Sequence, residues 1–305
     1  MTILRPGMLT TVQDLGRWGH QHLGVPVAGP MDWYSHRLAN AIVGNPEEAA
    51  ALEITLLGPE LVADVKTVCA IAGAEFEVTA GNRRVRSSEP FVLASGERLR
   101  FVHRVAGTRA TLAVSGGFTV PPVLGSRSTS LTSRLGPFGG RALKAGDVLP
   151  VGRSGGIRPH HPGRPMLLSR GGARVRVVLG PHENHFTEGA RRVFEQTRYV
   201  VTPDSNRMGY RLDGTRLEYA RRQDLLSDAT PVGSLQVPPS GCPILLMADR
   251  QTTGGYPRIA TVITADLPVA GQLGPGDWIE FEVCSRPSAI DALRRREGTL
   301  RGKRA

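Results

Sequence analysis

Pro275-Gly276-Asp277-Trp278-Ile279-Glu280-Phe281-Glu282-Val283 reads as a tight turn that leads directly into a strand. The strand is short, contains β-favouring residues and is preceded by the turn-forming Pro, Gly and Asp. Similar Gly–acid turns, at Ser95-Gly96-Glu97 and Ala145-Gly146-Asp147, precede two other expected strands. The recurrence hints at two related barrels, although turns of this kind are common in β proteins.

The rest of the chain is also predicted to be mostly β, with a few short helices. The 37 Gly and 23 Pro make up about a fifth of the sequence and imply many turns between short elements. A helix is expected at Trp33–Val43 behind an Asp32 cap, a short one from Pro46, another after Thr187, and a last one around Ser288–Arg296 that runs into a basic tail. Further strands are expected at Thr67–Ala72, Glu75–Thr79, Arg98–Val102, Arg109–Val114, Arg174–Leu179, Ile244–Met247 and Ala260–Ala265.

One polar segment divides the sequence. Residues 153–165 are rich in Gly, Pro, Arg and His, so the segment favours neither a ladder nor a helix. We therefore expect an N-terminal β-barrel domain with a helical segment at 1–155, a C-terminal β-barrel domain at 166–290 and a basic tail at 291–305.

The charge does not indicate a nucleic-acid protein. Of the net charge of +11, residues 291–305 carry +4, and the remaining +7 are spread over 290 residues without a basic run interleaved with aromatics. The three cysteines are far apart, and the N-terminus has no apolar signal core. No apolar stretch approaches the length of a bilayer span. We expect a soluble, cytoplasmic protein that binds neither nucleic acid nor membrane.

Several common sites are missing from the sequence. There is no Gly-x-x-x-x-Gly-Lys-Ser/Thr loop, no Gly-x-Gly-x-x-Gly after a strand and no biotinyl-lysine motif. His182 and His185 lie between a strand and a helix cap without a third ligand at a recognisable spacing, so no metal site is expected.

Two blocks place many specific polar residues in apolar surroundings. They are residues 205–212, Ser-Asn-Arg-Met-Gly-Tyr-Arg-Leu, and residues 249–257, Asp-Arg-Gln-Thr-Thr-Gly-Gly-Tyr-Pro. Hydroxyls, amides and paired glycines at strand ends can bring donors close to a ligand's oxygens. The same side chains can instead cap local backbone groups, and the residues alone do not decide between the two interpretations.

The motifs of the chain resemble, in order, those of the carboxyltransferase/allophanate hydrolase subunit 2 family. Besides the two blocks, the resemblance rests on stretches distributed from residue 3 to residue 286. They are Thr10-Thr11-Val12-Gln13-Asp14-Leu15-Gly16-Arg17, Gly29-Pro30-Met31-Asp32, Val43-Gly44-Asn45, Gly116-Gly117-Phe118, Gly125-Ser126-Arg127-Ser128-Thr129 and Gly233-Ser234-Leu235-Gln236-Val237-Pro238.

The resemblance implies two cyclophilin-like β-barrel domains and an enzyme that works with other subunits. Its main implication is a subunit of an ATP-dependent 5-oxoprolinase, a hydrolase that opens the lactam of 5-oxoproline to glutamate. The partners would be a subunit 1-type protein and a lactam-opening subunit, with ATP shared between them and this chain. The alternatives are the carboxyltransferase subunit of a biotin-dependent urea or amide carboxylase, with biotin attached to another chain, and a non-catalytic regulatory subunit that binds a partner.

The site residues follow from the two blocks once the resemblance is accepted. Both enzymatic activities must stabilise negative charge on the oxygen of a planar amide or ureido group. We expect catalytic roles for Asn206, Arg207 and Asp249. For Arg211 a structural ion pair is an equally good interpretation, and for the 125–129 loop so is a plain turn. Substrate binding is expected from Arg211, Gln236, Gln251, Thr252, Thr253 and Tyr256, and anion binding from Ser126, Arg127 and Ser128.

Overall fold

The structure, a computed structural model, describes residues 1–153, 163–168, 170–221 and 225–302, and contacts between residues divide the chain into two units. The first unit contains Met1–Trp18, Ala28–Leu168 and Glu297–Ala305. The second contains Gly19–Val27 and Ser169–Arg296. Most of the linker expected at 153–165 lies outside the described residues.

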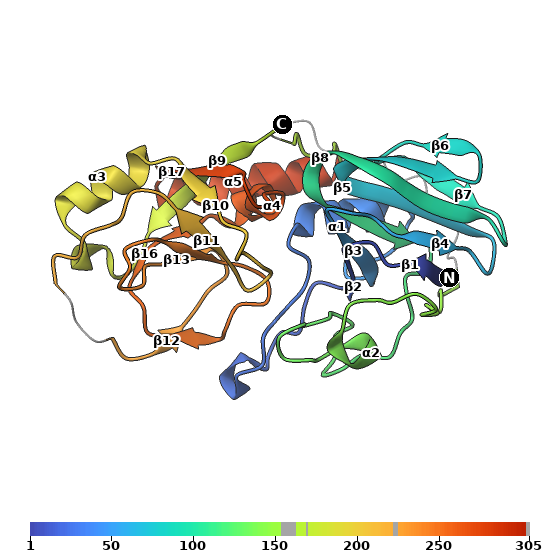
Figure 1. Cartoon of the computed structure of the whole chain (residues 1–305), viewed down its shortest axis with the longest axis horizontal. Helices are drawn as coiled ribbons and strands as arrows, with labels where there is room; N and C mark the ends of the chain where they lie inside the picture. Colours follow the sequence, from blue (N-terminus) through green and yellow to red (C-terminus); the bar gives the residue numbers. More distant parts are fainter. Residues whose placement is uncertain (154–162, 169, 222–224, 303–305) are drawn as a thin grey trace. The chain divides into compact units, whose positions relative to one another are not determined.

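The first unit is built on a curled sheet of eight strands (Figure 1). Its order is β1-β4-β8-β3-β2, and β5 pairs with β6, β7 and β8. Buried aliphatic side chains such as Ile3, Leu52, Ile54, Leu61 and Leu112 fill its core. The strands are β1 (Thr2–Arg5), β2 (Leu9–Gln13), β3 (Ala51–Thr55), β4 (Glu60–Val62), β5 (Thr67–Ala80), β6 (Arg83–Val85), β7 (Phe91–Leu93) and β8 (Arg98–Val114).

The long strands β5 and β8 differ from the four shorter strands that the sequence predicted in their place. Each runs through a glycine with positive φ, Gly73 in β5 and Gly107 in β8, where we had expected an interruption. The register between them shifts at three positions. Because a bulge absorbs an extra residue without ending the ladder, the two strands stay paired across these positions.

Helix α1 (Trp33–Ile42) covers part of this sheet and begins as predicted. The Asp32 carboxylate accepts a hydrogen bond from the Ser35 backbone N–H at 2.9 Å, which caps the helix. Its apolar face packs on alanines of the sheet, among them Ala70 and Ala113. The second short helix expected from Pro46 is a turn instead, because the Asn40 side-chain amide donates to the Ala49 carbonyl at 2.8 Å and fixes that segment.

The second unit contains a closed barrel of seven strands in the order β10-β11-β14-β13-β16-β9-β17. All neighbours are antiparallel except β9 and β17, which run parallel. Inward-facing Tyr210, Leu235, Leu245 and Phe281 are almost fully buried. The strands are β9 (Gly172–Leu179), β10 (Tyr199–Val201), β11 (Gly209–Asp213), β13 (Ser234–Gln236), β14 (Ile244–Leu246), β16 (Arg258–Val262) and β17 (Trp278–Val283).

Short elements complete the two units. A two-stranded ribbon, β12 (Asp228–Ala229) with β15 (Thr253–Gly254), stands apart from the barrel strands. Thr187 caps α3 (Glu188–Gln196) as expected, accepting from the Ala190 N–H at 3.0 Å. The remaining helices are α2 (Pro137–Gly140), α4 (Leu267–Gly271), α5 (Arg286–Leu300) and the 3-10 turns η1 (Gln21–Leu23), η2 (Glu183–His185) and η3 (Thr264–Asp266).

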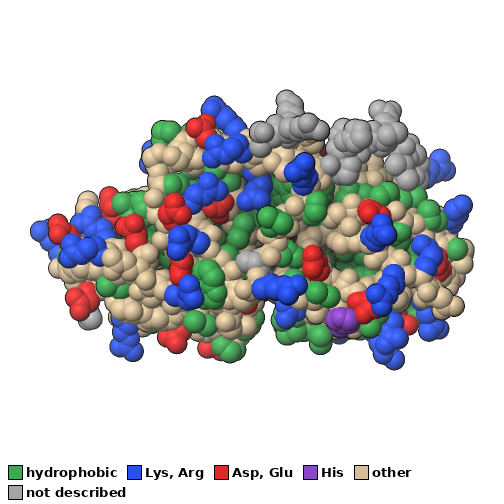
Figure 2. All heavy atoms as spheres, turned by 90° about the horizontal axis from the view of Figure 1, so that it is seen from above, with side chains coloured by type: hydrophobic (Ala, Val, Ile, Leu, Met, Phe, Trp, Pro, Cys, Tyr) green, Lys and Arg blue, Asp and Glu red, His purple; other side chains and the backbone are tan. Residues whose placement is uncertain are grey.

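The mostly β class predicted from the sequence is confirmed. The helix expected around Ser288–Arg296 is confirmed as part of α5, and residues 291–300 of the expected basic tail form the last two-thirds of that helix. On the face drawn in Figure 2, acidic side chains lie between the basic ones, which do not gather into a single stripe. Among the described residues, no helix has the length and apolar character needed to cross a membrane.

The three Gly–acid turns share one geometry. In each, the glycine has a positive φ, between 79° and 89°, as the third position of a type II turn requires. The acid's backbone N–H donates to the carbonyl three residues earlier, and its carboxylate accepts from the N–H of that same residue. The acid and that earlier residue are Glu97 and Ala94, Asp147 and Lys144, and Asp277 and Gly274.

Candidate functional site

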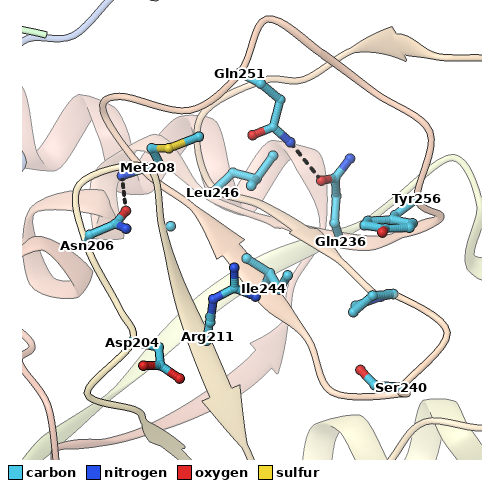
Figure 3. A pocket seen from close by; sticks show the side chains of 12 residues that line it. Asp204, Asn206, Met208, Arg211, Gln236, Ser240, Ile244, Leu246, Gln251 and Tyr256 are labelled. Carbon is cyan, nitrogen blue, oxygen red and sulfur yellow. Dashed lines mark hydrogen bonds between the residues drawn. The ribbon is translucent and has the colours of Figure 1, made fainter. Parts of the chain in front are cut away.

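A cavity of about 430 Å³ lies on the outer face of the second unit's barrel (Figure 3). Three neighbouring strands, β11, β14 and β13, form its floor, and three loops form its walls. Its volume is within the roughly 300–1,000 Å³ that small-molecule sites occupy. The lining residues are Asp204, Asn206, Met208, Gly209, Arg211, Gln236, Pro238, Ser240, Ile244, Leu246, Gln251 and Tyr256.

The floor is a row of residues paired across the strands. Arg211 pairs with Ile244, and Ile244 pairs with Gln236, so these three side chains share one face of the sheet. Their neighbours along the strands, including Leu245 and Leu235, are buried on the other face, inside the barrel. The alternation of a pleated strand thus brings Arg211 and Gln236 to the cavity from positions 25 residues apart in the sequence.

Arg211 presents the cationic group of the cavity. Its side chain is exposed and makes no ion pair with any described residue. The Arg211 backbone N–H donates to the Ser205 hydroxyl at 3.0 Å, which ties the strand to the preceding loop. The structure therefore gives no support to the alternative that Arg211 belongs to a structural ion pair, and its guanidinium extends over the floor in Figure 3.

Three side-chain amides line the walls and floor. The Asn206 Oδ1 accepts from the Met208 N–H at 2.8 Å, and the Asn206 side chain lies at the cavity edge. The Gln251 Nε2 donates to the Gln236 Oε1 at 3.1 Å. The Gln236 Nε2 is buried and has no hydrogen-bond partner among the described residues. A Cβ at Gly254 would come within 2.6 Å of that nitrogen, so a larger residue there would have to displace the Gln236 side-chain amide.

Arg207 and Asp249, both expected to be catalytic, lie behind the cavity rather than in its lining. The Arg207 Nε and Nη2 donate to the two Asp249 carboxylate oxygens at 3.1 and 3.0 Å. The two side chains are only 4% and 1% exposed. Two backbone hydrogen bonds, Asp249 N–H to Arg207 O and Met247 N–H to Met208 O, run beside the ion pair. The two sequence blocks are therefore joined side by side, through this pair.

Tyr256 lies at the cavity with its side chain about half exposed, but Thr252 and Thr253 are not among the lining residues. The Thr252 carbonyl accepts from the Thr230 N–H at 2.9 Å. Thr253 is part of β15 and pairs with Ala229 of β12. Both threonines therefore take part in the backbone pairing that joins the β12–β15 ribbon.

The expected anion site, Ser126, Arg127 and Ser128, belongs to the first unit and surrounds one of the chain's own carboxylates. Both hydroxyls donate to the Asp14 Oδ1 at 2.6 Å, and the Arg127 N–H donates to the Asp14 Oδ2 at 2.5 Å. The Arg127 Nε donates to the Val120 carbonyl. A foreign anion would have to displace Asp14 from these donors.

His182 and His185 pack edge to face, with ring centroids 5.5 Å apart. The His182 Nδ1 accepts from the Arg258 N–H at 3.2 Å, and burial is the largest cause lowering the pKa of His182. Within the part of the chain that the structure describes, no three His, Cys, Asp or Glu side chains are grouped to hold a metal ion.

About half of the residues that line the cavity were not predicted from the sequence. Ile244 and Leu246 were assigned to a strand, and the period of two would have placed them on one face with Arg211 once the pairing was known. Asp204 and Ser240 carried no motif signal, because their loops meet the cavity only through the fold. The other lining residues not singled out are Met208, Gly209 and Pro238.

The comparisons with known proteins agree on the family. The model of the family described as "Carboxyltransferase domain, subdomain A and B" matches residues 23–283. The chain is 40% identical to a 5-oxoprolinase subunit of Escherichia coli (strain K12), over 96% of this chain and 94% of that protein. It is 34% identical to urea amidolyase of Saccharomyces cerevisiae, over 94% of this chain but only 17% of that protein.

A solved structure gives the same picture. The crystal structure of the K. lactis urea amidolyase superposes with a TM-score of 0.93 at 33% identity, covering 99% of this chain and 20% of that one. The resemblance expected from the sequence motifs is confirmed over nearly the whole chain. The protein belongs to the family of carboxyltransferase domains made of subdomains A and B.

Proposed function

We propose that this chain is a subunit of an ATP-dependent 5-oxoprolinase and that the cavity on β11, β14 and β13 binds 5-oxoproline. The observation that carries the proposal is the guanidinium of Arg211, which lies beside side-chain amides and without an ion-pair partner among the described residues. 5-Oxoproline carries one carboxylate and one planar lactam. Arg211 would bind the carboxylate, and amide groups would face the lactam.

The other lining groups have complementary roles in this proposal. Opening the lactam places negative charge on its oxygen, and a side-chain N–H donor such as that of Asn206 stabilises such charge. Asp204 would accept a hydrogen bond from the lactam N–H. Arg207 and Asp249, held in their buried ion pair, would position the loop that carries Asn206. Among the expected catalytic residues, Asn206 alone would then touch the substrate.

Neither the cavity nor the hydroxyl-rich loop of the first unit suits a nucleoside triphosphate. The cavity lining contains one arginine and one carboxylate, and the hydroxyl-rich loop of the first unit is occupied by Asp14. We therefore assign ATP binding to partner subunits. The nearly full-length similarity to a protein that is, by its name, one subunit of 5-oxoprolinase supports a hetero-oligomer.

A second candidate is the carboxyltransferase part of a biotin-dependent urea carboxylase. The close superposition on urea amidolyase supports it, and the same amides suit a ureido group. In that case a biotin carrier would come from another chain, and Arg211 would face the transferred carboxylate. The two candidates demand different substrates, so activity assays separate them.

The test is reconstitution of the chain with a subunit 1-type protein and a lactam-opening subunit. ATP-dependent release of glutamate from 5-oxoproline is the expected result. Arg211→Ala should lower kcat/KM roughly 10- to 100-fold, since hydrogen bonds to charged groups contribute roughly 1.5–3 kcal/mol. Arg192→Ala, which removes an exposed arginine of α3 in the same unit, is the matched control.

Two outcomes would overturn the proposal. The first is bicarbonate-dependent ADP release with urea and a biotinylated carrier, without lactam opening, which would favour the second candidate. The second is lactam opening that Arg211→Ala leaves unchanged, which would move the substrate away from this cavity.

A further inference from the structure

The first unit carries a second, smaller cavity of about 220 Å³ beside β8, which we call the β8 groove. Residues of β1, of the β3–β4 loop, of β5 and of β8 line it. The residues that matter below are Arg5, Leu57, Phe76, Arg100, Phe101 and Arg104. None of them belongs to the cavity described above, and the inference does not rest on the proposed function.

The β8 groove has more positive charge than its own acids neutralise. The strand register places Arg5, Glu60 and Arg100 in one row across β1, β4 and β8. The Glu60 carboxylate lies 3.8 Å from Arg5 and 3.5 Å from Arg98. Neither Arg100 nor Arg104 forms an ion pair with a described residue, and the Arg104 Nη1 donates only to the Gly107 carbonyl at 2.6 Å. Two exposed guanidinium groups are therefore available to a carboxylate.

The floor of the β8 groove is aromatic and tightly built. The Phe76 and Phe101 rings meet edge to face, with centroids 5.3 Å apart. The β3–β4 loop presses on them: a Cβ at Gly58 would stand 2.3 Å from the Phe101 Cβ. Phe101 is only 6% exposed and belongs to the core, so the partly buried Phe76 presents most of the fixed apolar surface at the bottom of the charged opening.

A tight turn and two bulges expose apolar side chains in the lining of the groove or next to it. Leu56 has a φ of 59°, and the Leu57 N–H donates to the Thr55 carbonyl at 2.8 Å, so Leu56 is the centre of a tight three-residue turn. Leu57, next to it, is 64% exposed. Val102 and Val105 are the extra residues of two bulges in β8, and both are exposed. Strain and bulges that turn apolar side chains outward are typical of functional surfaces.

The size of the β8 groove decides what it can hold. At about 220 Å³ it lies below the roughly 300–1,000 Å³ of small-molecule sites. Arginine, leucine and phenylalanine around one pocket are a composition that favours protein interfaces. We propose that the β8 groove docks an acidic segment of a partner protein, with one apolar side chain of the partner against Phe76 and Phe101 and its carboxylates on Arg100 and Arg104.

The test uses the full chain and a fluorescein-labelled ten-residue peptide that carries one Phe flanked by Glu. Fluorescence anisotropy should show saturable binding, and replacing the Glu residues by Lys should abolish it. Arg100→Glu/Arg104→Glu and Leu57→Asp should each weaken binding by at least about tenfold, the effect of about 1.4 kcal/mol. Arg192→Glu/Arg294→Glu makes the same charge change at exposed positions elsewhere and should leave binding unchanged.

Circular dichroism melting of each variant distinguishes a folding defect from a loss of binding. Because Arg100, Arg104 and Leu57 are exposed, all variants should stay folded, with only a small decrease in melting temperature where Arg100→Glu places a carboxylate opposite Glu60. The proposal is overturned if no peptide binds up to millimolar concentration, or if the charge-reversed groove binds the acidic peptide as well as the wild type. It is also overturned if 3-phenylpropionate binds as tightly as the peptide, which would make the groove a small-acid site, or if Arg100→Glu/Arg104→Glu dissociates an oligomer of this chain.

Discussion

The Arg207 guanidinium holds the Asp249 carboxylate through two hydrogen bonds in a place that water hardly reaches. This pair links the loop that carries Asn206 to the loop that carries Gln251, and both of those side chains line the cavity. A bidentate arginine–carboxylate pair fixes direction as well as distance. Two of the three residues expected to be catalytic, Arg207 and Asp249, therefore hold these two loops together in the structure.

Asp249→Ala should lower the free energy of unfolding by about 3–5 kcal/mol, because it removes a buried carboxylate that accepts two hydrogen bonds from the Arg207 guanidinium. Replacing both partners, Arg207→Met with Asp249→Leu, should cost clearly less, since both charges of this pair are removed together. Urea unfolding at 25 °C measures both. Glu188→Ala, which removes one partner of an exposed pair on α3, should cost less than about 1 kcal/mol. A stable Asp249→Ala protein without activity would favour the catalytic role instead.

The elements that could be predicted from the sequence are those defined by near neighbours. The Asp32 and Thr187 caps and the three Gly–acid turns involve residues at most three positions apart, and each has the expected form. A turn of this kind needs only a glycine that accepts positive φ and an acid that reaches back one turn. Interactions between near neighbours determine these caps and turns, so the amino-acid sequence is sufficient to predict them.

The floor of the cavity could not be predicted in the same way. Whether Arg211 and Gln236 share a face depends on how β11, β14 and β13 pair, and a register change of one residue would send their side chains to the opposite face. The buried role of Arg207 depends on Asp249, 42 positions away. The motif resemblance pointed to two blocks that both contribute residues to the cavity, but the division into lining and supporting residues required the fold.

The buried Nε2 of Gln236 has no hydrogen-bond partner among the described residues, so a variant can test whether this amide serves function rather than stability. A buried donor without a partner costs about 1–3 kcal/mol. Gln236→Met keeps the length of the side chain and removes the amide, so the melting temperature should stay the same or rise. The Gln251 amide then loses its acceptor, and KM should rise about tenfold or more, as expected when a wall residue of the site is no longer oriented.

The matched control is Gln272→Met, a buried glutamine of the same unit that lies outside the cavity lining. Its KM should match the wild type. If Gln236→Met melts well below the wild type, the amide serves stability and the functional interpretation is wrong.

His36 predicts a dependence of stability on pH. Burial lowers the pKa of His36 from 6.5 to about 4, and the Asn40 amide lies 3.2 Å from its Nε2, a contact that a neutral ring accepts. The unfolded chain takes up this proton as the pH falls below about 6.5, whereas the folded chain does so only near pH 4. The contribution of the neutral His36 ring to the free energy of unfolding is therefore fully present above pH 6.5. It is lost as the pH falls from 6.5 to about 4, by about 3 kcal/mol in total.

Urea unfolding at several pH values measures this loss. His36→Gln removes the titrating ring, so its curve of stability against pH should be flatter over that window. His22→Gln, at an exposed position, should keep the slope of the wild type. Equal slopes for all three proteins would show that other groups cause the pH dependence.

Asp14 determines whether the Ser126–Ser128 loop can hold an anion. Four groups donate to its carboxylate: the hydroxyls of Ser126 and Ser128 and the backbone N–H groups of Arg127 and Gly16. Asp14→Ala leaves these donors without an acceptor and should lower the free energy of unfolding by about 3 kcal/mol.

The donors that Asp14→Ala leaves without the carboxylate suit an oxyanion. Phosphate at about 10 mM should therefore raise the melting temperature of Asp14→Ala by binding to the folded state, as mass action requires. Asp64→Ala, which removes an exposed carboxylate paired with the N-terminal amine, should respond to phosphate no more than the wild type. If phosphate raises the melting temperature of the wild type, Asp14→Ala and Asp64→Ala equally, the effect is general salt stabilisation. The Ser126–Ser128 loop would then bind only the Asp14 carboxylate and no free anion.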